Sequence, residues 1–202
     1  MSALISSRRR EGCFVRIIAG SAKGRTLVAP AGVTRPTSDR TREGIFSALE
    51  SEIGTCEGIS LLDLYGGTGA VGLEALSRGA AEVIAVEKDA KAANVCRENY
   101  ALIMNVVTGR FSVLRMSVDA FLDLDTNKES HFDVIYLDPP YDVPNSTIEK
   151  VLSKIIKKKI LRSDGVVIAE RASRSNAFSW PEGYTPMKER KYGEGTVYFA
   201  QF

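Results

Sequence analysis

Five short apolar segments, separated by stretches of helical character, constrain the fold of this chain more than any other feature. They cover residues 59–64, 82–87, 111–115, 132–137 and 165–170. Strands that are apolar throughout and alternate with helices are typical of a parallel sheet that is covered on both faces. We therefore predict an α/β fold with a doubly wound, mostly parallel sheet.

The two ends of the chain differ from this alternating pattern. Residues 14–30 contain two β-prone runs around a basic loop, which predicts a hairpin. Residues 184–202 repeat this arrangement around the turn Gly193-Glu194-Gly195, which predicts an antiparallel hairpin at one edge of the sheet. We divide the chain into a disordered basic arm (1–13), a β-hairpin extension (14–34) and the main domain (35–202).

The charges are distributed unevenly along the 202 residues, although the net charge is only +2. Residues 1–42 hold nine Lys and Arg against two acids, whereas the rest of the chain holds 18 basic and 23 acidic residues. A cationic end suggests contact with a polyanion, most simply a nucleic acid. A solvated basic tail without a partner is the alternative.

Several classes of protein are disfavoured by composition. No apolar run approaches the roughly 18 residues of a membrane span, so we expect no membrane association. Three cysteines, odd in number and far apart, and a single histidine, His131, fit neither a disulfide framework nor a metal centre. We expect a cytoplasmic protein without a metal.

A glycine-rich loop follows the first apolar segment, in the sequence DLYGGTGAVGLEAL. Gly67, Gly69 and Gly72 match the spacing G-x-G-x-x-G, and Glu87 ends the next predicted strand 20 residues after Gly67. This spacing predicts an adenosine cofactor, with Glu87 accepting hydrogen bonds from ribose hydroxyls, and leaves an NAD enzyme open. Asp63, within the strand, favours S-adenosylmethionine instead, because a carboxylate there can pair with the ammonium of that cofactor.

The segment FDVIYLDPPYD places an acid, two prolines and an aromatic ring after the fourth apolar segment. Asp138 and the carbonyl of Pro139 can accept the two N–H groups of an exocyclic base amine. Pro139 and Pro140 stiffen the loop and offer no competing N–H, and Tyr141 can stack on an extruded base. We predict methyl transfer to a base amine, although a plain turn is the structural alternative.

With these motifs in hand, the chain resembles the RsmD family of bacterial 16S ribosomal RNA guanine-N2 methyltransferases. The resemblance rests on RIIAGSAKGRTL, RPTSDRTREGIFSALE, LLDLYGGTGAVGLEALSRGA, SVDAF, YLDPPY and KYGEGTVYFAQF. It implies a class I S-adenosylmethionine-dependent methyltransferase fold, a Rossmann-like sheet. The implied reaction methylates N2 of one guanine of 16S ribosomal RNA, within an assembled or assembling small subunit, and leaves S-adenosylhomocysteine.

The resemblance also assigns residues. Its implied catalytic residues are Asp138, Pro139, Pro140 and Tyr141. Its implied cofactor residues are Asp63, Tyr65, Gly66, Gly67, Gly69, Glu87, Lys88, Asp119 and Asp138, with Asp119 near the adenine. Its implied RNA contacts are Arg16, Lys23, Arg25, Arg35, Arg40 and Arg42, of which Arg40 and Arg42 have an alternative role facing the cofactor carboxylate. Related loops often carry glycine at the position of Tyr65.

Three other functions stay open from the sequence. A DPPY enzyme can act on N6 of DNA adenine or on a protein glutamine amide, although this chain has no domain for reading a DNA target. An NAD oxidoreductase fits the glycine spacing but leaves Asp63 and Asp138 unexplained. A non-catalytic nucleic-acid binder fits the basic end and leaves the predicted pocket without a use.

Overall fold

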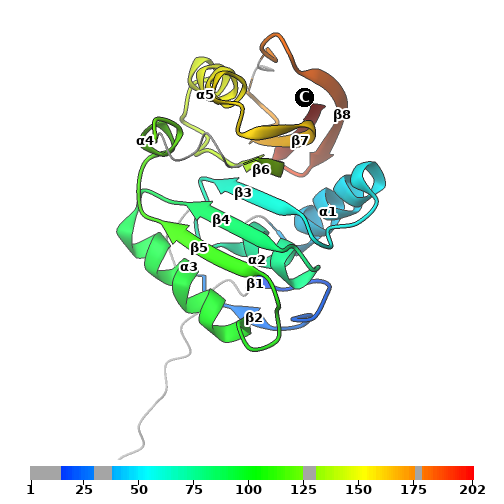
Figure 1. The fold of residues 1–202 in the computed structure, drawn as a ribbon, viewed down its shortest axis with the longest axis vertical. Helices are drawn as coiled ribbons and strands as arrows, with labels where there is room; N and C mark the ends of the chain where they lie inside the picture. The colour runs from blue at the N-terminus through cyan, green and yellow to red at the C-terminus, as the bar shows by residue number, and fades with distance from the viewer. Residues whose placement is uncertain (1–14, 30–37, 125–130, 176–178) are drawn as a thin grey trace, which may run out of the picture.

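A seven-stranded sheet forms the centre of the computed structural model, which describes residues 15–29, 38–124, 131–175 and 179–202 (Figure 1). The strand order is β5-β4-β3-β6-β7-β9-β8: the first five strands pair in parallel, and β9 pairs antiparallel with both β7 and β8. This arrangement confirms the predicted doubly wound sheet and its C-terminal hairpin. The strands are β3 (Ser60–Leu64), β4 (Glu82–Val86), β5 (Arg110–Leu114), β6 (Phe132–Leu137), β7 (Leu161–Ala172), β8 (Thr185–Tyr192) and β9 (Gly195–Gln201).

Helices cover both faces of the sheet. The helices α1 (Asp39–Ile53), α2 (Ala70–Ser77) and α3 (Ala90–Ile103) pack on one face through a shared apolar core. The helices α4 (Val118–Leu122) and α5 (Asn145–Lys158) pack on the other face through a second core. Alternate residues of β3 illustrate the division, because Leu61 belongs to the first core and Leu62 to the second.

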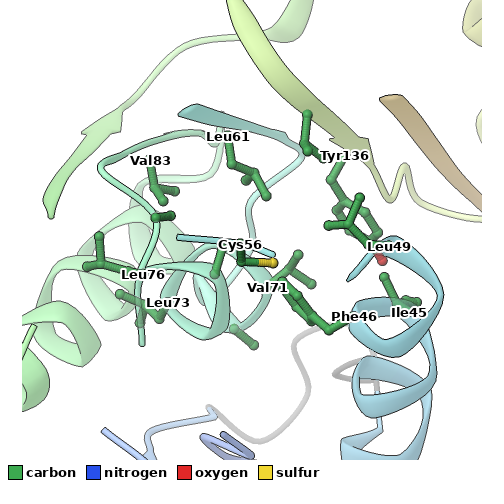
Figure 2. Packing of buried hydrophobic residues seen from close by; sticks show 14 of the residues in the cluster. Ile45, Phe46, Leu49, Cys56, Leu61, Val71, Leu73, Leu76, Val83 and Tyr136 are labelled. Atoms are coloured by element: carbon green, nitrogen blue, oxygen red, sulfur yellow. The ribbon is translucent and has the colours of Figure 1, made fainter. Parts of the chain in front are cut away.

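Helix α1 packs on the sheet through one apolar stripe. Ile45, Phe46 and Leu49 are buried at helical spacing and lie beside Leu61 and Tyr136 of the sheet (Figure 2). The helix begins where the Ser38 side chain accepts the N–H of Thr41 at 3.1 Å, and it ends at Gly54, whose φ is 83°. These local signals set the length of α1, and the buried stripe sets which face meets the sheet.

The predicted N-terminal hairpin is present but has very short strands, β1 (Val15–Arg16) and β2 (Thr26–Leu27). They pair antiparallel, with Val15 opposite Leu27. The loop between them lies on α2, where the Ser21 N–H donates to the carbonyl of Ser77 at 2.8 Å. The hairpin is therefore packed on the main domain, and the predicted arm 1–13 lies outside the described residues.

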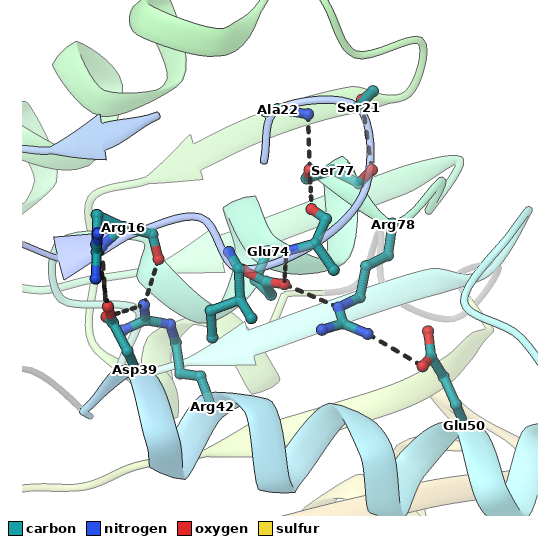
Figure 3. Close-up of polar contacts among 11 residues, drawn as sticks. Arg16, Ser21, Ala22, Asp39, Arg42, Glu50, Glu74, Ser77 and Arg78 are labelled. Carbon is teal, nitrogen blue, oxygen red and sulfur yellow. Dashed lines mark hydrogen bonds and ion pairs between the residues drawn. The ribbon is translucent and has the colours of Figure 1, made fainter. Parts of the chain in front are cut away.

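Buried polar groups join the hairpin to α2. Glu74, which has no exposed surface, accepts the main-chain N–H groups of Ile18 at 2.7 Å and Ala19 at 3.0 Å (Figure 3). The hydroxyl of Ser77 accepts the N–H of Ala22 at 2.9 Å and donates to the carbonyl of Ala19 at 2.5 Å. Two side chains of one helix thus satisfy the backbone of a loop that forms few ladder hydrogen bonds of its own.

The order of the strands creates a crevice beside β3. The chain passes from β3 to β4 and β5 on one side and from β6 to β7 on the other, so the connections diverge at β3 and β6. Ligands of open α/β sheets bind at such a point, beyond the carboxyl ends of the strands. Asp63 of β3 is registered directly opposite Tyr136 of β6. Among the described residues, no helix is long and apolar enough to cross a membrane.

Candidate active site

A cavity of about 1180 Å³ lies beyond the carboxyl ends of β3, β4, β6 and β7. Its volume exceeds the roughly 300–1,000 Å³ of most small-molecule sites, so it has room for a nucleoside cofactor and part of a second ligand. The predicted residues that line it are Asp63, Tyr65, Gly66, Gly67, Glu87, Lys88, Asp138, Pro139, Pro140, Tyr141 and Arg40. The two motifs that the sequence places more than 70 residues apart therefore share one cavity.

The loop after β3 depends on unusual backbone angles. Tyr65 has a φ of 70° and Gly67 a φ of 54°, both in the left-handed region. A side chain raises the energy of that conformation by roughly 1–2 kcal/mol, which explains why glycine is common where this chain has Tyr65. The N–H of Gly66 donates to the carbonyl of Val86 at 2.9 Å, so the loop is anchored to the end of β4.

Gly69 is not among the residues that line the cavity, and its predicted contact with a cofactor stays a prediction. It precedes α2 with a φ of 81°, and a Cβ atom there would lie 2.5 Å from Sγ of Cys96. Its function is to let the loop pack closely on α3, since any larger residue would meet that sulfur. The cavity wall on this side is formed instead by the neighbouring residues Thr68 and Ala70.

Asp63 is a buried acid in the floor of the cavity. Its side chain is only 2% exposed, and its Oδ2 accepts the N–H of Gly72 at 3.3 Å. Burial raises the pKa of Asp63 to about 7, against the lowering effect of the Gly72 hydrogen bond. A cation bound in the cavity would favour the ionised form, so Asp63 suits a ligand with an ammonium group.

Glu87 joins the glycine loop to the segment that follows β4. Its Oε2 accepts the N–H of Gly67 at 2.9 Å, and its Oε1 accepts the N–H of Asp89 at 2.7 Å. Glu87 lines the cavity together with the exposed Lys88. The carboxylate is thus oriented by two backbone donors and keeps acceptor capacity for a ligand hydroxyl.

The loop after β6 carries the predicted amine-binding residues and is held at both ends. The N–H of Asp138 donates to the carbonyl of Leu64 at 3.4 Å, and the N–H of Val143 donates to the carbonyl of Pro140 at 3.0 Å. Tyr141 is 44% exposed and lines the cavity, so its ring is accessible to a ligand. The arrangement combines a fixed acid with an accessible aromatic face.

Arg171, at the end of β7, supports this loop from behind. It is 3% exposed, and its Nη2 donates to the carbonyl of Val143 at 2.6 Å. Burial lowers the pKa of Arg171, and the charges of Tyr65 and Asp138 act in the opposite sense. Arg171 was not predicted, because nothing in the local pattern shows that β7 places a cation beneath a loop 28 residues earlier.

Tyr136 and Glu170 also line the cavity and were not predicted. The hydroxyl of Tyr136 donates to Oε2 of Glu170 at 2.9 Å, and both side chains are buried. Glu170 could have been predicted as a site residue from the sequence, because, like Glu87, it is an acid that ends an apolar segment. The turn between β8 and β9, residues 191–195, also lines the cavity and was predicted as a hairpin turn but not as part of the site.

Asp119 is not among the residues that line the cavity, and its place beside an adenine stays a prediction. Burial raises the pKa of Tyr65 most, and the charge of Asp119 is close enough to raise it further. Its carboxylate accepts from Nζ of Lys154 at 3.0 Å and is 66% exposed on the outer surface of α4. Position 119 lies in the unpredicted helix α4, which brings its carboxylate to Lys154 of α5. Met116 and Val118 line the cavity from this segment instead.

Arg42 is fully buried, which corrects its predicted role as an RNA or cofactor contact. Its Nη2 donates to the carbonyl of Arg16 at 2.6 Å and to Oδ1 of Asp39 at 2.8 Å (Figure 3). Helical spacing explains why Arg42 is buried, since it lies three and four residues before the buried Ile45 and Phe46 and so on the same face of α1. Arg42 joins α1 to the hairpin.

The other predicted RNA contacts occupy two places. Arg16, Lys23 and Arg25 are exposed on the hairpin, outside the cavity wall, and Arg16 also lies 3.6 Å from Asp39. Arg40 is exposed at the start of α1 and lines the cavity. The predicted contact Arg35 lies outside the described residues.

The residues that line the cavity fit S-adenosylmethionine as a bound group. An acidic floor with Asp63, Glu87 and Asp138 suits the positive charges of its ammonium and sulfonium, and the glycine loop exposes backbone beside them. Arg40 and the N-terminal end of α1 offer positive charge at the rim for a carboxylate. Over the parts of the chain that the structure describes, no cluster of His, Cys, Asp and Glu has the makings of a metal site.

Comparisons with known proteins place the chain in a family. The family model described as conserved hypothetical protein 95 matches residues 15–201. The chain is 36% identical over 157 residues to YlbH of Bacillus subtilis (strain 168), covering 77% of this chain and 82% of that protein. It is 33% identical over 180 residues to the ribosomal RNA small subunit methyltransferase D of Haemophilus influenzae, covering 89% of each.

A solved structure supports the same assignment. The structure of yhhF from Escherichia coli matches with a TM-score of 0.80 at 27% sequence identity, covering 94% of this chain and 98% of that one. The fold is thus that of the class I S-adenosylmethionine-dependent methyltransferases. The chain belongs to the conserved hypothetical protein 95 family, which is the RsmD family that its sequence motifs indicate.

Proposed function

We propose that this protein transfers a methyl group from S-adenosylmethionine to the exocyclic N2 amine of a guanine in small-subunit ribosomal RNA. The observation that carries the proposal is that Asp63 and Gly67 of the cofactor loop line one cavity with Asp138 and Tyr141. The name of the Haemophilus influenzae relative supports ribosomal RNA as the substrate class. The cytoplasm, where bacterial ribosomes assemble, is the expected compartment.

The chain's own residues hold the amine and its proton. An exocyclic amine is a weak nucleophile because its lone pair is delocalised into the base. Asp138 and the carbonyl of Pro139 accept its two N–H groups, which turns the lone pair towards the incoming methyl carbon and stabilises positive charge on nitrogen. S-adenosylmethionine supplies the methyl group as a sulfonium electrophile. The nitrogen then releases one proton, which the Asp138 carboxylate is positioned to accept.

Rigidity of the loop contributes to this role. The hydrogen bond from Asp138 to Leu64 fixes its start, and Arg171 fixes the carbonyl of Val143 near its end. A displacement of about 1 Å in such a site can lower the rate by roughly a hundredfold. The buried cation of Arg171 therefore acts through the loop as a positioning residue.

RNA contact is assigned to the exposed basic side chains. Arg16, Lys23 and Arg25 lie on the hairpin, which is joined to α2 by Glu74 and Ser77. Because these hydrogen bonds hold the hairpin on α2, its basic residues belong to the same packed unit as the cavity. Such contacts orient a nucleic acid and strengthen its binding without reading its sequence.

Two measurements test the proposal. Calorimetry should show binding of S-adenosylhomocysteine and none of NADH, and the opposite result would exclude methyl transfer. Tritiated-methyl transfer to small subunits, free RNA, DNA and protein, followed by mass spectrometry of the digested product, should yield N2-methylguanosine. N6-methyladenosine or methylglutamine would instead establish one of the alternative substrates.

A further inference from the structure

Glu170 is a buried acid of the cavity for which the proposed function has no role. It lies near the end of β7, is 6% exposed and lines the cavity. Its Oε2 accepts the hydroxyl of Tyr136 at 2.9 Å. Burial makes the charged form of Glu170 energetically unfavourable and therefore raises its pKa. A bound ligand that donates a hydrogen bond to the Glu170 carboxylate would offset this desolvation penalty.

The register of the sheet brings Glu170 next to Asp138. Strands β6 and β7 are parallel, and Leu137 is registered with Ala169, so Asp138 follows the end of β6 at the level where β7 continues to Glu170. Neighbouring strands of a sheet lie roughly 5 Å apart, so the two acids start from neighbouring backbones. The pKa of Tyr136 shows that both acids are near it. Burial raises this pKa most, and the carboxylates of Glu170 and Asp138 raise it further.

The second oxygen of Glu170 lies beside the turn that joins β8 to β9. A Cβ atom on Gly195 would lie 2.7 Å from Oε1 of Glu170. Only glycine at this position leaves room for that oxygen beside the turn, and Gly195 itself lines the cavity. Tyr136 thus fixes one oxygen of the carboxylate, and Gly195 keeps space beside the other.

The two adjacent acids match the hydrogen-bonding edge of one base. In guanine, the amine at C2 is next to N1–H, so the edge presents three donor hydrogens in a row. In adenine and cytosine, the amine is next to a ring nitrogen that carries a lone pair. An ionised carboxylate only accepts hydrogen bonds, so it attracts the guanine edge and repels the other two. Flipped bases are read through this edge.

We propose that Glu170 is the specificity-determining residue of the cavity, accepting N1–H of the target guanine through Oε1 while Asp138 binds the neighbouring amine. The proposal rests on the proposed function, because it concerns the base that this function methylates. The role of Glu170 explains why guanine is chosen over adenine, which the DPPY motif alone does not explain. Tyr136 acts as its positioning residue by holding Oε2.

The test compares guanine with 2-aminopurine at the methylated position. That analogue keeps the amine at C2 but has a bare N1 in place of N1–H. Once the position is mapped, RNA is prepared with either base. The wild-type protein should methylate guanine at least about 100-fold faster, because a site built to accept a hydrogen bond rejects a base that lacks the donor.

The variant Glu170→Gln should reverse this preference. Its amide oxygen can still accept the Tyr136 hydroxyl, and its N–H groups can donate to the bare N1 of 2-aminopurine. We expect guanine methylation to fall by about 100-fold and 2-aminopurine methylation to rise, with S-adenosylhomocysteine affinity unchanged. The matched control Glu189→Gln, on the exposed surface of β8, should keep the wild-type preference.

Each other outcome overturns the proposal. It is wrong if wild-type protein methylates both bases equally, a result that needs no variant. It is also wrong if Glu170→Gln keeps the preference for guanine, or lowers both rates by the same factor as a damaged site would. Failure of the proposed function has a separate signature: wild-type protein would bind S-adenosylhomocysteine and leave guanine unmethylated in every RNA and particle.

Discussion

The carboxylate of Glu74 accepts the main-chain N–H of Ile18 at 2.7 Å, across 56 positions of sequence. The same carboxylate also accepts from Ala19 and from Nε of Arg78, and it has no exposed surface. One buried acid of α2 therefore holds both the N-terminal hairpin and a neighbouring cation. This relationship makes the stability of the hairpin depend on a residue of the catalytic domain.

Replacing Glu74 should destabilise the whole domain. The variant Glu74→Ala leaves two buried N–H donors and Arg78 without this acceptor, which should lower the free energy of unfolding by about 3–5 kcal/mol. Urea denaturation followed by circular dichroism measures the loss. The control is Glu50→Ala, since Glu50 is partly exposed and binds the same Arg78 at 3.0 Å. Its loss should be below about 1 kcal/mol, and equal losses would contradict the buried acceptor role.

Two glycines of the hairpin loop form a matched pair. Gly20 and Gly24 have φ of 79° and 82°, but a Cβ atom on Gly20 would lie 1.7 Å from the carbonyl oxygen of Ser77, whereas one on Gly24 meets nothing within 4 Å. Gly24→Ala should cost about 1–2 kcal/mol from the backbone angle alone. Gly20→Ala should cost several kcal/mol in addition, or displace the loop. Similar melting temperatures for the two variants would argue against tight docking on α2.

Binding of the cofactor product should depend on pH through Asp63. Burial raises its pKa to about 7, so the acid is largely protonated at about pH 6 and ionised at about pH 8. Because the ammonium of S-adenosylhomocysteine pairs with the ionised form, the Kd should be about tenfold weaker at the lower pH. Calorimetry of wild-type protein and Asp63→Asn measures this, and the variant should bind weakly with little pH dependence. A flat wild-type profile would exclude the pairing.

The same acid has the opposite effect on the stability of the free protein. The pKa of Asp63 is about 7 in the folded chain against an ordinary value of 3.8, so the folded state binds the extra proton between these values. Its contribution to the free energy of unfolding is therefore greatest at low pH and is lost as the pH rises towards about 7. The difference in stability between wild-type protein and Asp63→Asn should follow that trend.

Variants of the amine-binding loop should lower the rate of methyl transfer without weakening the binding of the cofactor product. Asp138→Ala removes one acceptor of the base amine, so methyl transfer should fall by about 10²–10³-fold while S-adenosylhomocysteine still binds. Tyr141→Ala should lower kcat/KM by an amount equivalent to about 1–3 kcal/mol, whereas Tyr141→Phe keeps the stacking face and most activity. Full activity of Asp138→Ala, or equal losses in the two Tyr141 variants, would disprove these roles.

The hairpin charges should contribute to RNA binding through counterion release. Changing Lys23 and Arg25 together to Ala should reduce the slope of log affinity against log salt by about one for each lost phosphate contact. Cofactor affinity should stay constant, because neither side chain lines the cavity. The control changes Lys150 and Lys157, which are exposed on α5 across the sheet from the hairpin. An equal effect of both pairs would indicate general electrostatics rather than a defined contact.

Much of the fold and part of the site could be predicted from local sequence. The alternation of apolar strands and helices predicts the parallel sheet, and the carboxyl edge of such a sheet is where Gly67 and Asp138 must meet. These inferences succeed because periodicity and turn chemistry act over a few residues. They missed the five-residue helix α4, and they fail for Arg42, whose place on the buried face of α1 was not considered.

The sequence by itself determined the class of fold, the two loops and the acidic and aromatic chemistry of the motif around Asp138. Only the tertiary structure decided that Glu74 holds the hairpin, that Arg171 supports the loop after β6 and that Glu170 lies beside Asp138. Each of these depends on strand register or helix packing between segments at least 28 positions apart. Such contacts are selected by the burial of whole apolar faces, and no short stretch of residues specifies them.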